Sequence, residues 1–283
     1  MSKTHQNSWI FLIPSLMGFS LFYLLPFGAA FKETLMSEGA KQTFVGLKNY
    51  ISLFQNEIYT SGLKHSLIFI GCAVPIGMTC ALLIALGIKR LSGQKKLLQC
   101  LFLVPLVIPT ASIAFFWKQF FAPHGLFSML VQIIGITPID WLQSDYAMPI
   151  IIFIFVWKNI GYNTILFTAG LYQISMTYYE SAGLDGANGL QVFRYITLPN
   201  LSETTLLVFI MSVVNSFKVF KEIYLIAGGY PHESIYMLQH YMNNMFLSLN
   251  YVKLSTSAYI LIFTLVLVMG LVRQMRRKHE FEA

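Results

Sequence analysis

The sequence predicts an all-α, polytopic membrane protein with six transmembrane helices. Hydrophobic residues make up 56% of its 283 residues and charged residues only 11%, whereas a soluble domain usually has about 25% charged residues. Lys and Arg exceed Asp and Glu by 19 to 12, an excess that can accompany nucleic-acid binding. Because these charges lie mainly between the apolar stretches, we expect contact with membrane lipid and not with nucleic acid.

Six apolar stretches are long enough to cross a bilayer as helices. A hydrocarbon core about 30 Å thick takes about 20 helical residues, because a backbone polar group left unpaired in lipid is costly. The first stretch exceeds the apolar region of a secretory signal and lacks a clear small-residue cleavage site, so we expect an uncleaved helix. Prolines 14, 26, 75, 105 and 109 predict kinks. The expected spans are residues 9–31, 63–88, 97–117, 147–171, 201–227 and 257–272.

The distribution of Lys and Arg predicts the orientation of the chain. Six expected spans place ten basic residues on the side that holds both termini, and six on the other side, where the loops are longer. Basic residues in short loops concentrate on the cytoplasmic side of a membrane. We therefore expect both termini in the cytoplasm.

A segment of 29 residues between the fourth and fifth expected spans, Tyr172 to Asn200, is too apolar for a flexible linker. An apolar surface of this kind on a loop usually marks a protein contact. Three glycines divide the segment into two helix-capable pieces, about 176–185 and 189–196. Pro199 stands where the next helix begins, a position at which its missing N–H needs no partner. The segment is therefore predicted to form a helix, a turn and a second helix.

The spacing of residues in this segment resembles that of a known family. The matching positions are Glu180, Ser181, Ala182, Gly186, Ile196, Leu198 and Pro199. They reproduce the "EAA" loop of the transmembrane subunits of binding-protein-dependent ABC importers, with Ser181 in place of the usual second Ala as the only departure. The wider run looks like the carbohydrate branch, the MalF-like and UgpA-like permeases.

Three further segments are similar to the same branch: residues 44–50, 117–125, and 216–224 together with 228–231. The family usually has an acidic residue where Lys221 stands and a third Gly where Tyr230 stands, so these positions do not identify the solute. The resemblance extends from residue 9 to residue 273.

The resemblance implies a type I ABC importer transmembrane domain and the function of a permease subunit in an ATP-driven sugar or oligosaccharide importer of a bacterial inner membrane. Residues 1–283 would form one transmembrane domain, with a helix at about 9–31 and a permease core at about 62–273. The implied partners are a second, homologous permease subunit, two ATPase subunits, an extracytoplasmic solute-binding protein and a carbohydrate substrate. ATP and Mg would be bound by the ATPase subunits, and no cofactor is expected on this chain.

The resemblance also assigns roles within the loop, which would act as a lever moved by the ATPases. Glu180 and Gly186 would hold its first helix in a socket, and Ser181 and Ala182, next to Gly183, would allow close approach there. Asp185 would cap that helix or pair with a basic partner; a solvated turn residue is an equal alternative. The loop ends at Ile196, Leu198 and Pro199.

Enzyme motifs are absent from the sequence. No Gly-x-x-x-x-Gly-Lys-Ser/Thr run is present to hold nucleotide phosphates, and no His-Glu-x-x-His or Gly-x-Ser-x-Gly run indicates a protease or esterase. We therefore expect a transport subunit without catalytic or metal-binding residues.

Polar residues inside two expected spans are candidates for a substrate path, because ionisable groups in a membrane usually face a cavity or the bundle interior. Asn215, Lys218 and Glu222 share one helical face within about 60°, and Lys218 could pair with Glu222. The fourth span carries Lys158, Asn159, Tyr162 and Asn163. Sugar C–H faces suit aromatic rings, which adds Trp157, Phe217 and Phe220 to the candidates. Packing between helices, or contact with a partner permease, is the alternative for each group.

Two other classes remain open from the sequence. A secondary carrier would transport without ATPase subunits, although the chain shows no convincing internal repeat. A non-transporting membrane scaffold would also use an apolar docking loop. Within the importer class, the solute could instead be glycerol phosphate or a polyol.

Overall fold

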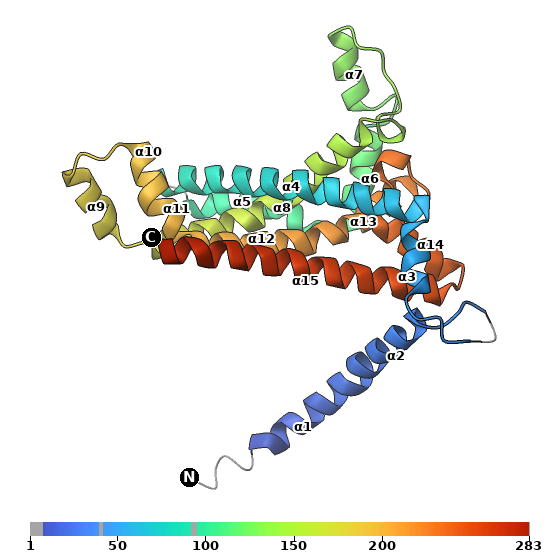
Figure 1. Ribbon diagram of the computed structural model, residues 1–283. Coiled ribbons are helices and arrows are strands. Elements are labelled where there is room, and N and C mark those ends of the chain that lie inside the picture. Colours follow the sequence, from blue (N-terminus) through green and yellow to red (C-terminus); the bar gives the residue numbers. More distant parts are fainter. Residues whose placement is uncertain (1–7, 40–41, 92–94, 283) are drawn as a thin grey trace. The chain divides into compact units, whose positions relative to one another are not determined.

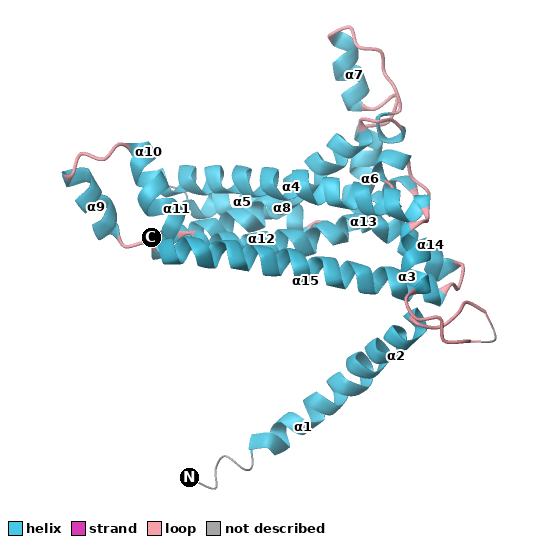
Figure 2. Ribbon diagram, in the orientation of Figure 1, coloured by secondary structure: helices cyan, strands magenta, loops and turns pink. Residues whose placement is uncertain are grey.

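The computed structural model describes residues 8–39, 42–91 and 95–282, and every regular element in these ranges is helical apart from one isolated β-bridge, Met36 with Phe44. Figure 1 labels these helices in chain order, and Figure 2 shows the helices and the loops between them. By its internal contacts the chain divides into two compact units. Unit 1 comprises Met1–Thr60 and Tyr241–Val266, and unit 2 comprises Ser61–His240 and Leu267–Ala283. Each unit is described separately below.

Unit 1 contains a continuous helical stretch that runs from α1 (Ser8–Phe19) through a π-helical turn (Ser20–Leu24) into α2 (Leu25–Thr34). The ring of Tyr259 in α15 (Tyr251–Glu282) packs against Phe27 and Phe31, with centroids 4.9 and 5.2 Å away. Asn49 in α3 (Lys48–Phe54) donates to the Thr34 carbonyl oxygen at 2.8 Å. These contacts fix α2 to α3 and to α15 within the unit.

Unit 2 is built around α8. Its other helices are α4 (Glu57–Arg90), α5 (Lys95–Val107), α6 (Thr110–Phe120), α7 (Leu126–Ile133), α8 (Ala147–Gln173), α9 (Met176–Leu184), α10 (Gly189–Val192), α11 (Leu198–Asn200), α12 (Ser202–Ser216) and α13 (Phe220–Ala227). A π-helical turn (Phe193–Thr197) precedes α11, and 3₁₀ turns are formed by Trp141–Gln143, Phe217–Val219 and Glu233–Ile235. α14 (Leu238–Leu247) begins in this unit.

Glycines let α8 approach its neighbours closely. A Cβ atom on Gly161 would lie 1.8 Å from the carbonyl oxygen of Phe102 in α5, and one on Gly170 would lie 2.3 Å from Thr204 Oγ1 in α12. Small residues at such crossings allow helix backbones to pack closely within a membrane. Two apolar clusters extend this packing, one around Ile151 and Ile223 and the other around Phe167 and Leu201.

The prediction of six spans is not confirmed. Four helices are long and apolar enough to cross a membrane: Leu12–Thr34, Glu57–Arg90, Ala147–Gln173 and Tyr251–Gly270. The expected third span is divided between α5 and α6, which are bent by 93° at a break containing Pro109. Pro109 is extended, with ψ 136°, and its ring disfavours a helical conformation at the preceding residue. Counting that broken pair as one span gives five.

Of the six predicted spans, the fifth, residues 201–227, differs most from what the structure shows. It is divided into α12, the 3₁₀ turn Phe217–Val219 and α13. Lys218, Lys221 and Glu222 all lie in or after the turn. No single helix in this segment is therefore both long and apolar enough to count as a span by itself.

Candidate functional site

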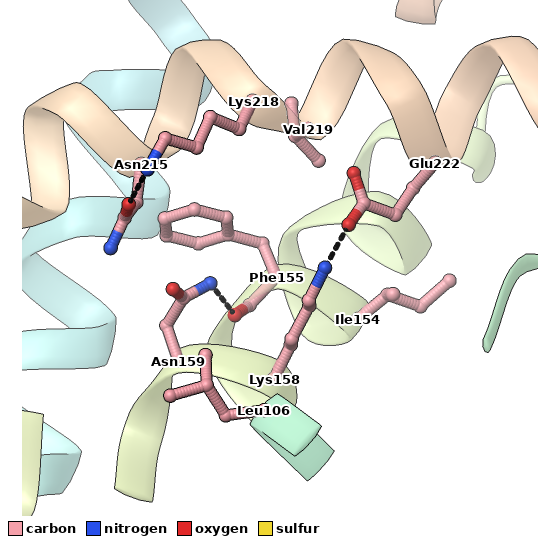
Figure 3. A pocket seen from close by; sticks show the side chains of 9 residues that line it. All are labelled: Leu106, Ile154, Phe155, Lys158, Asn159, Asn215, Lys218, Val219 and Glu222. Carbon is pink, nitrogen blue, oxygen red and sulfur yellow. Dashed lines mark hydrogen bonds and ion pairs between the residues drawn. The ribbon is translucent and has the colours of Figure 1, made fainter. Parts of the chain in front are cut away.

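A cavity of about 180 Å³ lies within unit 2 between α8 and the α12–α13 segment (Figure 3). Its polar lining comes from α8, from the end of α12, from the 3₁₀ turn and from the first turn of α13. Figure 3 draws the ring of Phe155 between the side chains of Asn215 and Asn159. The lining residues are Leu106, Ile154, Phe155, Lys158, Asn159, Asn215, Lys218, Val219 and Glu222.

An ion pair between Lys158 and Glu222 joins the two walls of the cavity. The side chains are 18% and 5% exposed, and Lys158 also donates to Thr110 Oγ1 of α6 at 3.3 Å. The second carboxylate oxygen of Glu222 is buried and has no hydrogen-bond partner among the described residues. A buried acceptor of this kind is costly when unpaired, so a donor brought by a ligand would find a vacant partner there.

The predicted pairing of Lys218 with Glu222 is wrong. Lys218 donates to Asn215 Oδ1 at 3.0 Å, while Glu222 is bound by Lys158. The 3₁₀ turn explains the difference, because each of its residues advances by about 120° instead of 100°. Lys218 is thereby turned to an exposed position, and Glu222 stays buried.

The structure brings together five of the ten residues predicted for a substrate path: Lys158, Asn159, Asn215, Lys218 and Glu222 line the cavity. The other five do not. The ring of Trp157 packs against that of Trp117 in α6, with centroids 5.3 Å apart. Asn163 donates to Ser212 Oγ of α12 at 3.1 Å, a contact between helices. The ring of Phe220 packs against His240 of α14, 4.8 Å away. Tyr162 and Phe217 are half-buried outside the lining.

Sequence reasoning missed the apolar part of the lining and Thr110. Phe155 lies one turn before Asn159 on α8 and accepts a hydrogen bond from its amide at 2.9 Å, so helical spacing could have indicated it. Leu106 and Thr110 belong to α5 and α6, and their places depend on the bend at Pro109. No local pattern reveals that approach.

The segment Tyr172–Asn200 forms the predicted helix, turn and second helix. Ser175 caps α9, and Asp185 occupies its C-terminal cap position. Gly186 follows with φ +73°, and the Ala187 N–H donates to the Ala182 carbonyl oxygen at 2.9 Å. This left-handed residue after a helix end is typical of glycine. Asn188 and Gln191 then form a capping box at the start of α10.

Much of the apolar surface of this segment is exposed. Leu184 is 91% exposed, Leu190 76% and Tyr195 71%. Among the positions matched to the "EAA" loop, Glu180, Ser181, Gly186, Leu198 and Pro199 are exposed, as are Gly183 and Asp185, whereas Ala182 is buried and Ile196 is half-buried. Ile196 packs against the apolar cluster around Phe167 and Leu201, while the exposed apolar side chains of the segment are left uncovered.

Tyr179 of α9 contacts the end of α4 and the π-helical turn that follows α10. The Lys89 ammonium lies 4.1 Å from the centre of the Tyr179 ring, and the Tyr179 hydroxyl lies 3.3 Å from Thr197 Oγ1. Lys89 also donates to the Leu171 carbonyl oxygen of α8 at 3.2 Å. α9 is therefore linked through Lys89 of α4 to α8, which lines the cavity.

Within the described ranges, no group of three or more His, Cys, Asp or Glu side chains is placed to hold a metal ion.

Comparison with known proteins identifies the family. The family described as "Binding-protein-dependent transport system inner membrane component" matches residues 73–278. The probable ABC transporter permease protein YurN of Bacillus subtilis is 31% identical over 245 residues, 83% of each chain. The trehalose/maltose transport system permease protein MalF of Thermococcus litoralis is 29% identical over 232 residues, 79% of this chain and 77% of that protein.

A solved structure shares the fold. A chain in the crystal structure of a bacterial ABC transporter involved in the import of the acidic polysaccharide alginate superposes with a TM-score of 0.84 at 23% identity, over 98% of this chain and 96% of that one. The chain described here therefore belongs to the binding-protein-dependent transport inner membrane components, and it is the non-catalytic, multi-pass permease subunit of an ABC importer.

Proposed function

We propose that this permease imports a carbohydrate, which passes through the cavity between α8 and the α12–α13 segment. The trehalose/maltose relative and the alginate importer, by their names, both handle saccharides. The cavity combines the Phe155 ring with amide, ammonium and carboxylate groups. Such a combination suits a sugar, because rings pack on its C–H faces while its hydroxyls need both donors and acceptors. Unpaired Glu222 Oε2 is one acceptor ready for a hydroxyl.

One observation carries the coupling part of the proposal: the Tyr172–Asn200 segment connects α8 directly to α12, the two helices whose side chains form opposite walls of the cavity. Lys158 and Asn159 belong to α8, and Asn215 belongs to α12. A partner that pushes on α9 would therefore move both walls. Its exposed apolar side chains, led by Leu184, supply the surface that such a partner would grip.

The proposed assembly contains a second, homologous permease, two ATPase subunits at the α9–α10 surface and an extracytoplasmic solute-binding protein. In this arrangement the chain is a single transmembrane domain of type I topology with six crossings, where α5–α6 and α12–α13 each count as one broken crossing. Both termini lie in the cytoplasm. Discontinuous helices at a binding site are a common feature of transporters, because their freed backbone groups can face a cavity.

An anionic carbohydrate is the second candidate substrate. The cavity lining carries Lys158, Lys218 and Glu222, and the first and last of these neutralise each other. Lys218 leaves one net positive charge on an exposed side chain. Replacing Lys218 by Met in the assembled transporter would weaken uptake of an acidic oligosaccharide and spare a neutral one if the solute is acidic.

The test of the coupling proposal uses Gly186→Val in the assembled transporter. A β-branched residue at φ +73° is strained, at a cost of about 1–3 kcal/mol, and would distort the end of α9. We expect the complex to assemble, solute-stimulated ATP hydrolysis to fall severalfold, and uptake to fall with it.

The matched control is Gly135→Val, because Gly135 has φ +83° and equally open surroundings but lies outside the segment. It should impose similar backbone strain and leave coupling intact. Wild-type stimulated ATPase activity in Gly186→Val, or an equal loss in both variants, would refute the coupling role.

A further inference from the structure

One face of α7 is fixed to the core of unit 2. Ser128 is 1% exposed; it donates to the Ala122 carbonyl oxygen at 2.8 Å and accepts from the indole N–H of Trp141 at 2.9 Å. The Phe127 ring packs against Phe121 and Trp141, with both centroids 5.0 Å away. The hydrogen bonds of Ser128 and the ring contacts of Phe127 fix the rotation of α7 about its own axis. They therefore also fix which side chains its opposite face presents.

The outer face of α7 is uncovered and apolar. It consists of Leu126, Met129, Leu130 and Ile133, which are 61%, 55%, 58% and 81% exposed. At 100° per residue these four side chains fall within about 100° on the helical wheel. A rigid helix of eight residues thus presents a stripe of large apolar side chains away from the protein.

Charge and side-chain size decide whether a soluble protein, another transmembrane helix or membrane lipid covers this stripe. Residues 119–139 include no Asp, Glu, Lys or Arg, whereas the docking surface for a soluble protein normally has a polar, charged rim. Interfaces between transmembrane helices are enriched in small residues, but the stripe contains only Leu, Met and Ile. Large aliphatic side chains without charged neighbours suit the acyl-chain boundary of a bilayer.

The anchored face of α7 adjoins exposed rings of α6, which belongs to the bent candidate span formed by Gln99–Val107 and Thr110–Phe120. Phe116 of α6 is 52% exposed and stacks on Phe120, whose ring lies 6.2 Å from that of Phe127 in α7. Within unit 2, α7 projects sideways from the end of α8 opposite α9 (Figure 1). Because α8 crosses the membrane, a helix that projects sideways at its end lies near the plane of the bilayer surface.

We propose that α7 is an interfacial helix, which inserts Leu126, Met129, Leu130 and Ile133 into the acyl-chain boundary of the leaflet at its end of unit 2. Its anchored face then ties the lipid surface to the cluster of rings that includes Trp141 and Phe121. That cluster also contains Ile154 and Val219, two residues of the cavity lining. The proposal depends only on the membrane location of the protein.

The test places a nitroxide on the stripe. Ile133→Cys is made in the assembled transporter after Cys72, Cys80 and Cys100 are replaced by Ala, since none of the three thiols is buried. The complex is reconstituted in vesicles of phosphatidylethanolamine and phosphatidylglycerol. Collision rates of the nitroxide with oxygen, which partitions into lipid, and with a water-soluble nickel chelate are then measured.

Asp145→Cys is the aqueous control, because this exposed charged residue lies in the loop before α8. We expect the oxygen-to-nickel ratio at Ile133 to exceed that at Asp145 severalfold. Met129→Cys, on the same stripe, repeats the test if the first variant fails to assemble. A ratio at Ile133 equal to the control would place the stripe in water. Protection from both reagents would mean that protein covers it; either result overturns the proposal.

Discussion

The spacing between α5 and α8 depends on Gly161, and adding one methyl group there should be costly. An ideal Cβ atom would lie 1.8 Å from the Phe102 carbonyl oxygen, and contacts below 3.0 Å essentially never occur. The α5 backbone would therefore have to retreat by about 1.2 Å. Overpacking costs about 1–3 kcal/mol, while the better helix propensity of Ala returns about 0.5–1 kcal/mol. We expect Gly161→Ala to destabilise the protein by about 1–2 kcal/mol net.

The same retreat should impair transport, because Phe102 lies one turn from Leu106 in the cavity lining. The assay measures the fraction of purified complex that stays monodisperse after heating, together with uptake in proteoliposomes. Gly87→Ala is the matched control: it is also a helical glycine, but its Cβ would meet nothing within 4 Å. Gly87→Ala should leave unchanged, or raise, the temperature at which half of the complex stays monodisperse. If Gly161→Ala matches Gly87→Ala in both measurements, the close-approach argument is wrong.

Two further predictions concern buried polar groups. Lys158→Met leaves the carboxylate of Glu222 buried and unpaired and should lower the free energy of unfolding by about 3–5 kcal/mol. Adding Glu222→Leu removes the unpaired charge and should recover most of the lost thermal midpoint. Equal midpoints for the single and double variants would contradict this. Burial lowers the pKa of His240, which lies outside the candidate spans and is 0% exposed, to about 4 from 6.5. Because unfolding then takes up a proton, the thermal midpoint should fall as the pH is lowered from 6.5 to 4. His240→Leu should fall less steeply over this window, and an unchanged slope would exclude His240 as the cause.

Local patterns in the sequence predicted the elements that depend on one stretch of chain. The apolar stretches 63–88 and 147–171 correspond to α4 and α8, and the glycine spacing in Tyr172–Asn200 predicted the turn between α9 and α10. The expectation of an importer permease is confirmed by the family match. In each case the signal is length, periodicity or a helix cap, which neighbouring residues determine among themselves.

Arrangements that depend on distant residues could not be predicted in this way. The partner of Glu222 is Lys158 on another helix, since a short 3₁₀ turn rotates Lys218 away from the face that the two would share in a regular helix. The bend at Pro109 likewise brings Thr110 to the Lys158 ammonium. A single sequence records neither the rotation of a helix after a break nor the helix that lies opposite.

The sequence by itself determined that this chain is a helical membrane protein and which family it belongs to, because hydropathy, capping residues and motif spacing are properties of short segments. Only the tertiary structure decided which polar side chains meet in a cavity, and that α7 presents an apolar stripe while its other face is anchored by Ser128. Those outcomes are set by packing. A close contact at a glycine, or a break in a helix, decides whether side chains that are distant in the sequence meet in space.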